Sequence, residues 1–125
     1  MTKKIVFALM FVCCCMAFAG DSLAADAPTI EELEKAATAG HAKSQYTLGL
    51  RYISGKDVPK DYDKAREWFE KAAEQNYEKA QFNLGLMYAK GDGVKQDDAT
   101  AKEWFKRACD NGDQRGCDAY SRLTK

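Results

Sequence analysis

Two stretches of the chain, 36 residues apart, carry one pattern: residues 45–61 read QYTLGLRYISGKDVPKD and residues 81–97 read QFNLGLMYAKGDGVKQD. The register continues without a gap to Ala108 and gives thirteen identities in 36 aligned positions. A period of this size is typical of a helical solenoid, in which each repeat buries its apolar face against its neighbours. The sequence therefore predicts repeats at 44–79 and 80–115.

Each repeat predicts two helices joined by a turn. Leu48, Gly49 and Tyr52 lie at i, i+1 and i+4, which is one face of a helix. A glycine inside a helix costs about 1 kcal/mol relative to alanine, so Gly49 indicates a neighbouring helix that approaches closely there. Gly55 is expected to end the first helix, and Asp61 to cap the second. The second repeat predicts the same elements 36 residues later.

The same frame extends beyond the two repeats. Residues 29–40 are predicted as an N-terminal half-repeat, whose helix begins with a capping box between Thr29 and Glu32. Cys117 takes the place of Gln81, so residues 114–124 are predicted as a C-terminal capping helix. The expected fold class is all-α: a short right-handed α-solenoid of antiparallel helix hairpins, with about six helices.

Residues 1–24 have a different composition. Lys3 and Lys4 are followed by an apolar run of fifteen residues at 5–19, and Ser22 and Ala24 place small residues before a cleavage point. This pattern is typical of a secretory signal peptide, cleaved near Ala24 or at a competing site after residue 19. The run is shorter than the roughly 20 residues of a membrane-spanning helix, which argues against the alternative of an uncleaved anchor. We expect residues 25–125 to form a periplasmic or secreted domain with no membrane span.

Charge and cysteine content narrow the function further. Nineteen basic and nineteen acidic residues give a net charge of zero, so no basic surface for nucleic acid is expected. Removal of residues 1–24 leaves two of the five cysteines, Cys109 and Cys117. In an exported protein such a pair is a disulfide candidate, since thiols are oxidised outside the cytosol. A redox or metal role is the weaker alternative, because two thiols are an incomplete zinc site.

The repeats resemble the Sel-1-like repeat family, a relative of the tetratricopeptide repeat. The residues that carry the resemblance are Leu84 to Tyr88, Gly91 to Val94, Ala101 to Trp104 and Ala108. Ser44 and Asp57 depart from the family pattern, which prefers alanine and glycine there.

The resemblance implies an adaptor or regulator of envelope or secreted partners. Ala108-Cys109 followed by Gly116-Cys117 is similar to the cysteine-rich secreted branch of the family, in which such a pair bridges neighbouring helices. Cys109 falls in the last turn of one predicted helix and Cys117 in the first turn of the next, within reach of a disulfide.

Catalysis has little support in the sequence. His41 is the only histidine, and its place between two predicted helices indicates a solvated turn residue. The resemblance leaves one alternative, a weak β-lactamase or penicillin-binding activity, but the chain lacks the Ser-x-x-Lys arrangement of that chemistry. We predict no catalytic residue, no metal site and no cofactor.

A protein or peptide partner is the expected ligand. In stacked helical hairpins the first helices line a concave surface, on which the residues between core positions face the groove. An aromatic stripe at helical spacing is more often packing than contact, and that alternative stays open here. If exposed, the residues form an apolar strip edged by lysines, suited to an extended or helical peptide of acidic character. Self-association through open helical ends is a further possibility. The candidate partner-binding residues are Lys43, Tyr46, Leu50, Ile53, Lys79, Phe82, Leu86 and Lys90.

Overall fold

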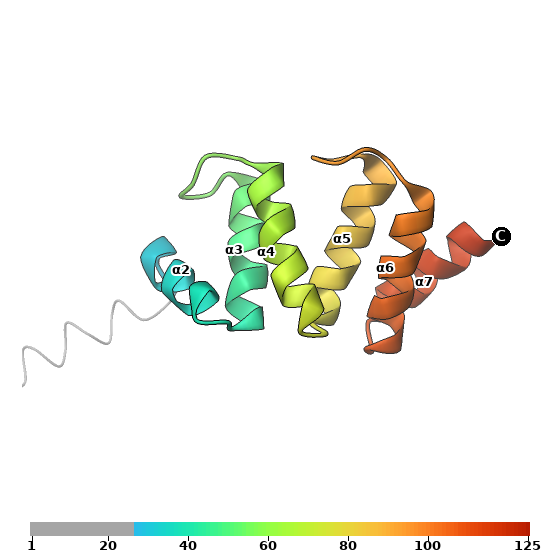
Figure 1. Cartoon of the computed structure of the whole chain (residues 1–125), viewed down its shortest axis with the longest axis horizontal. Coiled ribbons are helices and arrows are strands. Elements are labelled where there is room, and N and C mark those ends of the chain that lie inside the picture. The colour runs from blue at the N-terminus through green and yellow to red at the C-terminus, as the bar shows by residue number, and fades with distance from the viewer. Residues whose placement is uncertain (1–26) are drawn as a thin grey trace, which may run out of the picture.

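A computed structural model describes residues 27–125; the expected signal peptide at 1–24 lies outside them. The described residues form six helices and no strand (Figure 1). This confirms the predicted all-α solenoid of helix hairpins. The helices are α2 (Ile30–Thr38), α3 (Ala42–Ser54), α4 (Tyr62–Glu74), α5 (Glu78–Lys90), α6 (Asp98–Asp110) and α7 (Gln114–Thr124).

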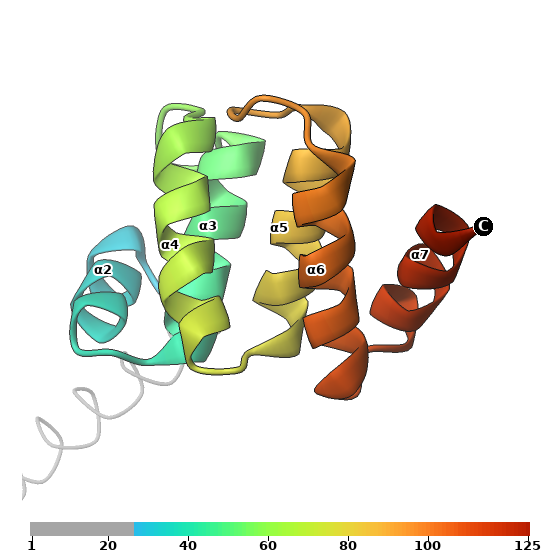
Figure 2. The same cartoon turned by 45° about the vertical axis from the view of Figure 1, so that its right-hand side comes forward.

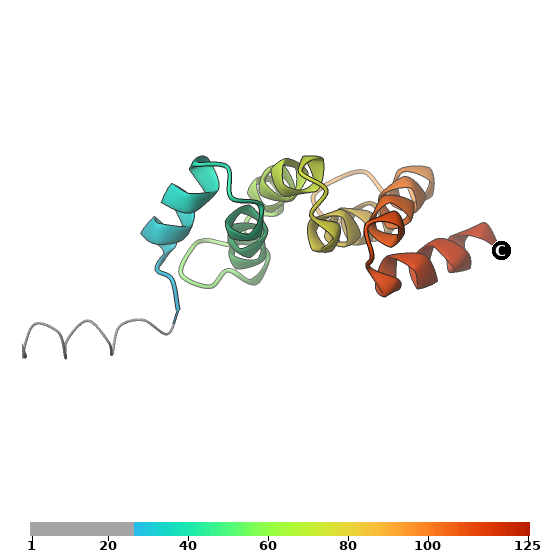
Figure 3. The ribbon, with the colours of Figure 1, turned by 90° about the horizontal axis from the view of Figure 1, so that it is seen from below.

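The helices stand in two rows. Each packs against the next along the chain, and α3–α4 and α5–α6 form the two antiparallel hairpins (Figure 2). Seen end-on, α3, α5 and α7 form one row and α2, α4 and α6 the other (Figure 3). The first helices of the repeats therefore share one face of the molecule, which we call the α3–α5–α7 face.

Polar side chains fix the starts of the helices as the sequence predicts. Thr29 and Glu32 form the capping box of α2, in which the Thr29 N–H donates to Glu32 Oε2 at 2.9 Å. Asp61 accepts from the backbone N–H of Lys64 at 3.1 Å at the start of α4, and Asp97 caps α6 in the same way. These bonds satisfy N–H groups that the helix itself leaves unpaired.

The glycine inside each first helix admits an aromatic ring. A Cβ atom on Gly49 would lie 2.5 Å from Cε1 of Phe69, and one on Gly85 would lie 2.5 Å from Cε1 of Phe105. The close approach expected from the sequence is thus made by a phenylalanine of the second helix. Phe69 is fully buried and belongs to the core with Leu48.

None of the helices within residues 27–125 has the length and apolar character needed to cross a membrane.

Candidate functional site

Three hollows lie along the α3–α5–α7 face. The first, of about 410 Å³, lies at the N-terminal ends of α5 and α7 and is mostly polar. The second, of about 340 Å³, lies between α3 and α5 and is mostly apolar. The third, of about 260 Å³, lies between α5 and α7. Leu86 lines both the second and the third hollow, and Arg115 lines both the third and the first. The three hollows are therefore adjacent to one another along the face, and together we call them the track.

The eight candidate residues all keep contact with solvent. Seven of them line at least one of the three hollows, whereas Lys43 is exposed but lines none of the three. Leu50 is 38% exposed, unusually so for a large apolar side chain of this protein. The exposed members are Lys43, Leu50, Lys79 and Lys90, and the half-buried members are Tyr46, Ile53, Phe82 and Leu86.

The two aromatic candidates also serve packing. The ring of Tyr46 lies 5.8 Å from that of Phe69 and 5.3 Å from that of Tyr77, measured between centroids. Phe82 lies 5.6 Å from Phe105. Such tilted aromatic pairs stabilise a fold beyond the area they bury. Tyr46 and Phe82 are therefore part of the wall of the track as much as its contact surface.

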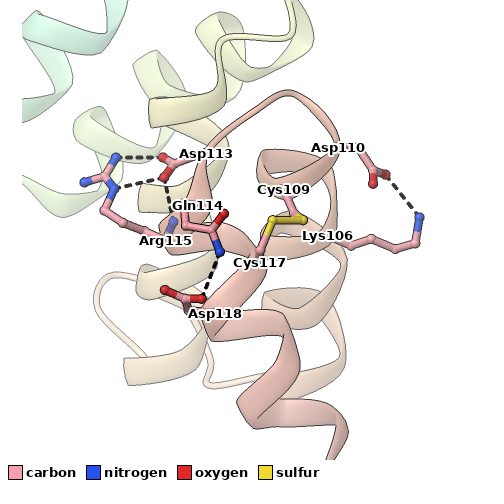
Figure 4. Close-up of a disulfide and its surroundings, with 8 residues drawn as sticks. All are labelled: Lys106, Cys109, Asp110, Asp113, Gln114, Arg115, Cys117 and Asp118. Atoms are coloured by element: carbon pink, nitrogen blue, oxygen red, sulfur yellow. Dashed lines mark hydrogen bonds and ion pairs between the residues drawn. A yellow bond between two sulfur atoms is a disulfide. The ribbon is translucent and has the colours of Figure 1, made fainter.

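A salt bridge at the start of α7 adds a feature that the sequence analysis missed. Arg115 donates from Nε to Asp113 Oδ1 at 3.0 Å and from Nη2 to Asp113 Oδ2 at 2.7 Å (Figure 4). The centre of the guanidinium lies 4.4 Å from the centroid of the Phe82 ring. The Asp113 side chain is only 6% exposed, whereas that of Arg115 is 54% exposed. A buried carboxylate and an aromatic face thus hold one arginine in place on the track.

The same contacts set the protonation of the pair. Hydrogen bonds from Arg115 hold the pKa of Asp113 below its ordinary value, and Asp113 in turn raises the pKa of Arg115. Asp113 also caps α7, because its Oδ1 accepts from the backbone N–H of Arg115 at 3.0 Å. The sequence carries a signal for each residue but none for their contact: Arg115 is in register with the basic Lys79, and an aspartate directly before a predicted helix indicates a cap.

Cys109 on α6 and Cys117 on α7 are joined by a disulfide, with a Cα–Cα distance of 4.5 Å (Figure 4). Both cysteines are half-buried. In the repeat frame their places correspond to Ala73 and Gln81, where Gln81 Nε2 donates to the carbonyl of Ala73 at 3.1 Å. At the α6–α7 junction a disulfide therefore occupies the position that a buried amide hydrogen bond occupies at the α4–α5 junction.

The described residues offer no metal-binding cluster. No group of three or more His, Cys, Asp or Glu side chains within residues 27–125 is arranged to hold an ion. His41 is exposed at the N-cap of α3 and makes no side-chain capping bond.

The chain is similar to known repeat proteins. The profile of the Sel1 repeat matches residues 42–77 and 78–113. Each match has the predicted period of 36 residues and begins two residues before the predicted bounds, because a continuous repeat has no unique first residue. A 40-residue stretch is 46% identical to the secretory immunoglobulin A-binding protein EsiB of Escherichia coli O6:H1, and covers 32% of this chain and 8% of EsiB.

Three solved structures share the fold. A Sel1 repeat protein of Oxalobacter formigenes has a TM-score of 0.69 and 37% identity over 72% of this chain and 37% of its own. A protective antigen of uropathogenic Escherichia coli with an SLR fold has a TM-score of 0.68 and 42% identity over 70% of this chain and 19% of its own. Cysteine-rich protein B of Helicobacter pylori has a TM-score of 0.68 and 31% identity over 70% of this chain and 66% of its own.

The chain thus spans only part of the length of each of these relatives. Sel1 repeat proteins are generally modules for protein–protein interaction rather than enzymes. Since the two repeat matches together cover more than half of the chain, the protein belongs to the Sel1 repeat family.

Proposed function

We propose that this protein is an exported interaction module of the cell envelope or its surroundings, an adaptor or regulator that binds a protein or peptide partner through the α3–α5–α7 face. One observation carries the proposal: apolar side chains stay partly exposed to solvent in a hollow of that face. Leu50, Ile53 and Leu86 line this hollow, with Lys90 beside them. Partly apolar hollows edged by polar groups are where protein ligands gain binding energy.

Export rests on two features of the chain. Residues 1–24 have the basic start, apolar run and small residues of a signal peptide. The disulfide between Cys109 and Cys117 belongs to an oxidising compartment such as the periplasm or the extracellular space.

EsiB is named for binding immunoglobulin A, a protein partner. For the present chain we propose the class of partner, a protein or peptide, and not its identity.

The test compares two leucines of nearly equal exposure. Leu50 is 38% exposed and lines the apolar hollow, whereas Leu123 is 37% exposed and lines none of the three hollows. The full chain is expressed in an exporting bacterium, and proteins crosslinked to wild type, Leu50→Asp and Leu123→Asp are identified by mass spectrometry. We expect Leu50→Asp to lose specific partners that Leu123→Asp keeps. Identical partners for all three proteins would contradict binding through this face.

Two controls complete the test. Light scattering at several concentrations separates binding of a partner from self-association of the protein. Turnover of nitrocefin by the purified protein would contradict the absence of catalysis, provided that a point mutation in the domain abolishes it.

A further inference from the structure

One arginine on the α3–α5–α7 face is held ready for a ligand. Asp113 binds Nε and Nη2 of Arg115, and Phe82 lies under the guanidinium. The other terminal nitrogen, Nη1, donates no hydrogen bond to any residue of the described chain. An arginine fixed in this way loses little conformational entropy when it binds a carboxylate, because its rotamer is already set.

A second arginine, Arg122, lines the third hollow together with Arg115. In the third hollow the only acidic side chain is Asp118, which accepts a hydrogen bond from Gln114 at 3.1 Å. Arg122 lies in the same hollow, is exposed, and has no ion-pair partner within residues 27–125. Glu78 lies on the other side of Arg115, in the first hollow, together with Lys79. Between α5 and α7, two guanidinium groups therefore have donors that no residue of the described chain uses: Nη1 of Arg115 and the nitrogens of Arg122.

The neighbouring hollows bear on whether the acid of the ligand lies within the peptide or at its end. Leu86 connects the third hollow to the apolar one, whereas Arg115 connects the third hollow to the polar one. A peptide lying along the track would pass Arg115 rather than stop there, because the hollows continue on both sides. An acidic side chain inside the peptide fits this arrangement better than a carboxylate at its end.

We propose that the face binds an extended peptide through an internal Asp or Glu, whose carboxylate pairs with Arg115 and Arg122, while an apolar side chain of the same peptide enters the hollow of Leu50, Ile53 and Leu86. This inference rests on the proposed function and names its ligand class. Arg115 is the residue that selects the acid, and Asp113 and Phe82 position it. Charge-assisted hydrogen bonds to a fixed arginine combine strength with geometric selectivity.

An array of randomised ten-residue peptides tests the proposal. Each peptide is N-acetylated and made in two forms, with a C-terminal amide and with a free carboxylate. The protein, expressed as the full 125-residue chain in an exporting host, is applied as wild type, Arg115→Gln, Arg122→Gln and Arg107→Gln. Arg107 is the matched control, because its guanidinium also lies over an aromatic ring, 5.0 Å from the centroid of Trp104, but on α6.

The expected result is selection of amidated peptides that contain an acidic and an apolar residue at a fixed spacing. Arg115→Gln should lower the affinity for these peptides about five- to tenfold and remove the preference for the acid, while the apolar preference stays. Arg107→Gln should bind as wild type does. Arg122 makes no ion pair within the described chain, so Arg122→Gln should weaken binding without affecting the fold.

Other outcomes would overturn either the acidic ligand or the binding face itself. Peptides selected without an acid, or an acid preference that survives in both Arg115→Gln and Arg122→Gln, would overturn the inference and leave the proposed function standing. Binding only of the free-carboxylate form would overturn the internal position of the acid. Binding of no peptide, together with partners that Leu50→Asp does not change, would overturn the proposed function itself.

Discussion

The junction between α4 and α5 and the junction between α6 and α7 occupy equivalent places in the repeat, and they are fastened differently. At the first, Gln81 is buried and its amide bonds the carbonyl of Ala73. At the second, Cys117 and Cys109 stand at the equivalent positions and form a disulfide. The same position of the repeat thus accommodates either a buried hydrogen bond or a disulfide between successive helices.

Two more differences accompany the change. Ala80 at the α4–α5 junction is replaced by Gly116, whose added Cβ would lie 2.7 Å from Ala108 Cβ and 2.8 Å from the Phe105 carbonyl oxygen. Tyr77, which makes no side-chain cap on α5, is replaced by Asp113, which caps α7. Among the described helices, α7 is thus held by local bonds of its own, whereas α5 is held by neighbours on both sides.

Removing the disulfide should have the largest effect. The bond closes a loop between residues eight apart, so the double change Cys109→Ala, Cys117→Ala should lower the free energy of unfolding by about 2–3 kcal/mol. Urea unfolding with and without a reductant measures this. The sharper variant is Cys109→Ala with Cys117→Gln, which transplants the glutamine fastening and should recover about 1 kcal/mol. A reductant that leaves wild type unchanged would show that the cysteines are not paired.

Adding one methyl group to Gly116 should come next. The Cβ of Gly116→Ala meets backbone atoms of α6, including Cys109 N at 2.9 Å, and the backbone cannot move aside as a flexible side chain can. We expect a loss of about 1–3 kcal/mol from overpacking. Ala80→Gly is the matched control at the other junction; it loses about 1 kcal/mol of helix propensity and also a fully buried methyl group. Thermal unfolding of the two variants measures both losses; a Gly116→Ala variant as stable as wild type would contradict the tight packing of α7 on α6 at this position.

Removing the hydrogen bonds of the buried Gln81 amide should lower the free energy of unfolding by a smaller amount. In Gln81→Leu the carbonyl of Ala73 and the amide of Asn111 both lose their partner, since Asn111 donates to Gln81 Oε1 at 2.9 Å. Leaving such groups unpaired costs about 1–2 kcal/mol, partly offset by the added apolar contact. Hydrogen exchange followed by NMR should show faster exchange in α4 and α5 than in α7. Uniform faster exchange over all helices would contradict a local role.

The smallest effect is expected from low pH, which protonates the Asp113 carboxylate. The pKa of Asp113 in the folded protein lies below the ordinary 3.8, so its stabilising contribution is present above that pH and is lost as the pH falls through the lowered value. The difference in stability between wild type and Asp113→Asn should therefore shrink below about pH 4. Thermal unfolding at pH 7, 4 and 3 measures it. Asp97→Asn is the control for the loss of a capping carboxylate in general, because Asp97 also has a lowered pKa but caps α6 and not α7.

Features that lie within one repeat can be predicted from the sequence, whereas contacts between repeats cannot. The period, the caps at Thr29, Asp61 and Asp97 and the six helices follow from patterns within a repeat, and those patterns predict them. Gln45 and Gln81 recur in the frame, but their bonds to the carbonyls of the preceding helix appear only in three dimensions.

The site was predicted less completely, for a physical reason. Sequence spacing identifies which residues of α3 and α5 share a face, and seven of the eight candidates line the hollows. Arg115 lies where the repeat identity ends, and its role depends on a buried carboxylate two residues away and on a ring of α5. No periodic pattern encodes a contact of that kind.

The buried glutamines have a mechanical consequence. Gln45 bonds Ala37 of α2 and accepts from Gln75 at the end of α4, so one amide connects three successive helices. Gln81 does the same with Ala73 and Asn111. A pull along the solenoid would stretch hydrogen bonds that can open and re-form, whereas the disulfide keeps α7 beside α6. Separating α7 from α6 therefore requires breaking a covalent bond, whereas the described residues form no such bond between the helices from α2 to α6.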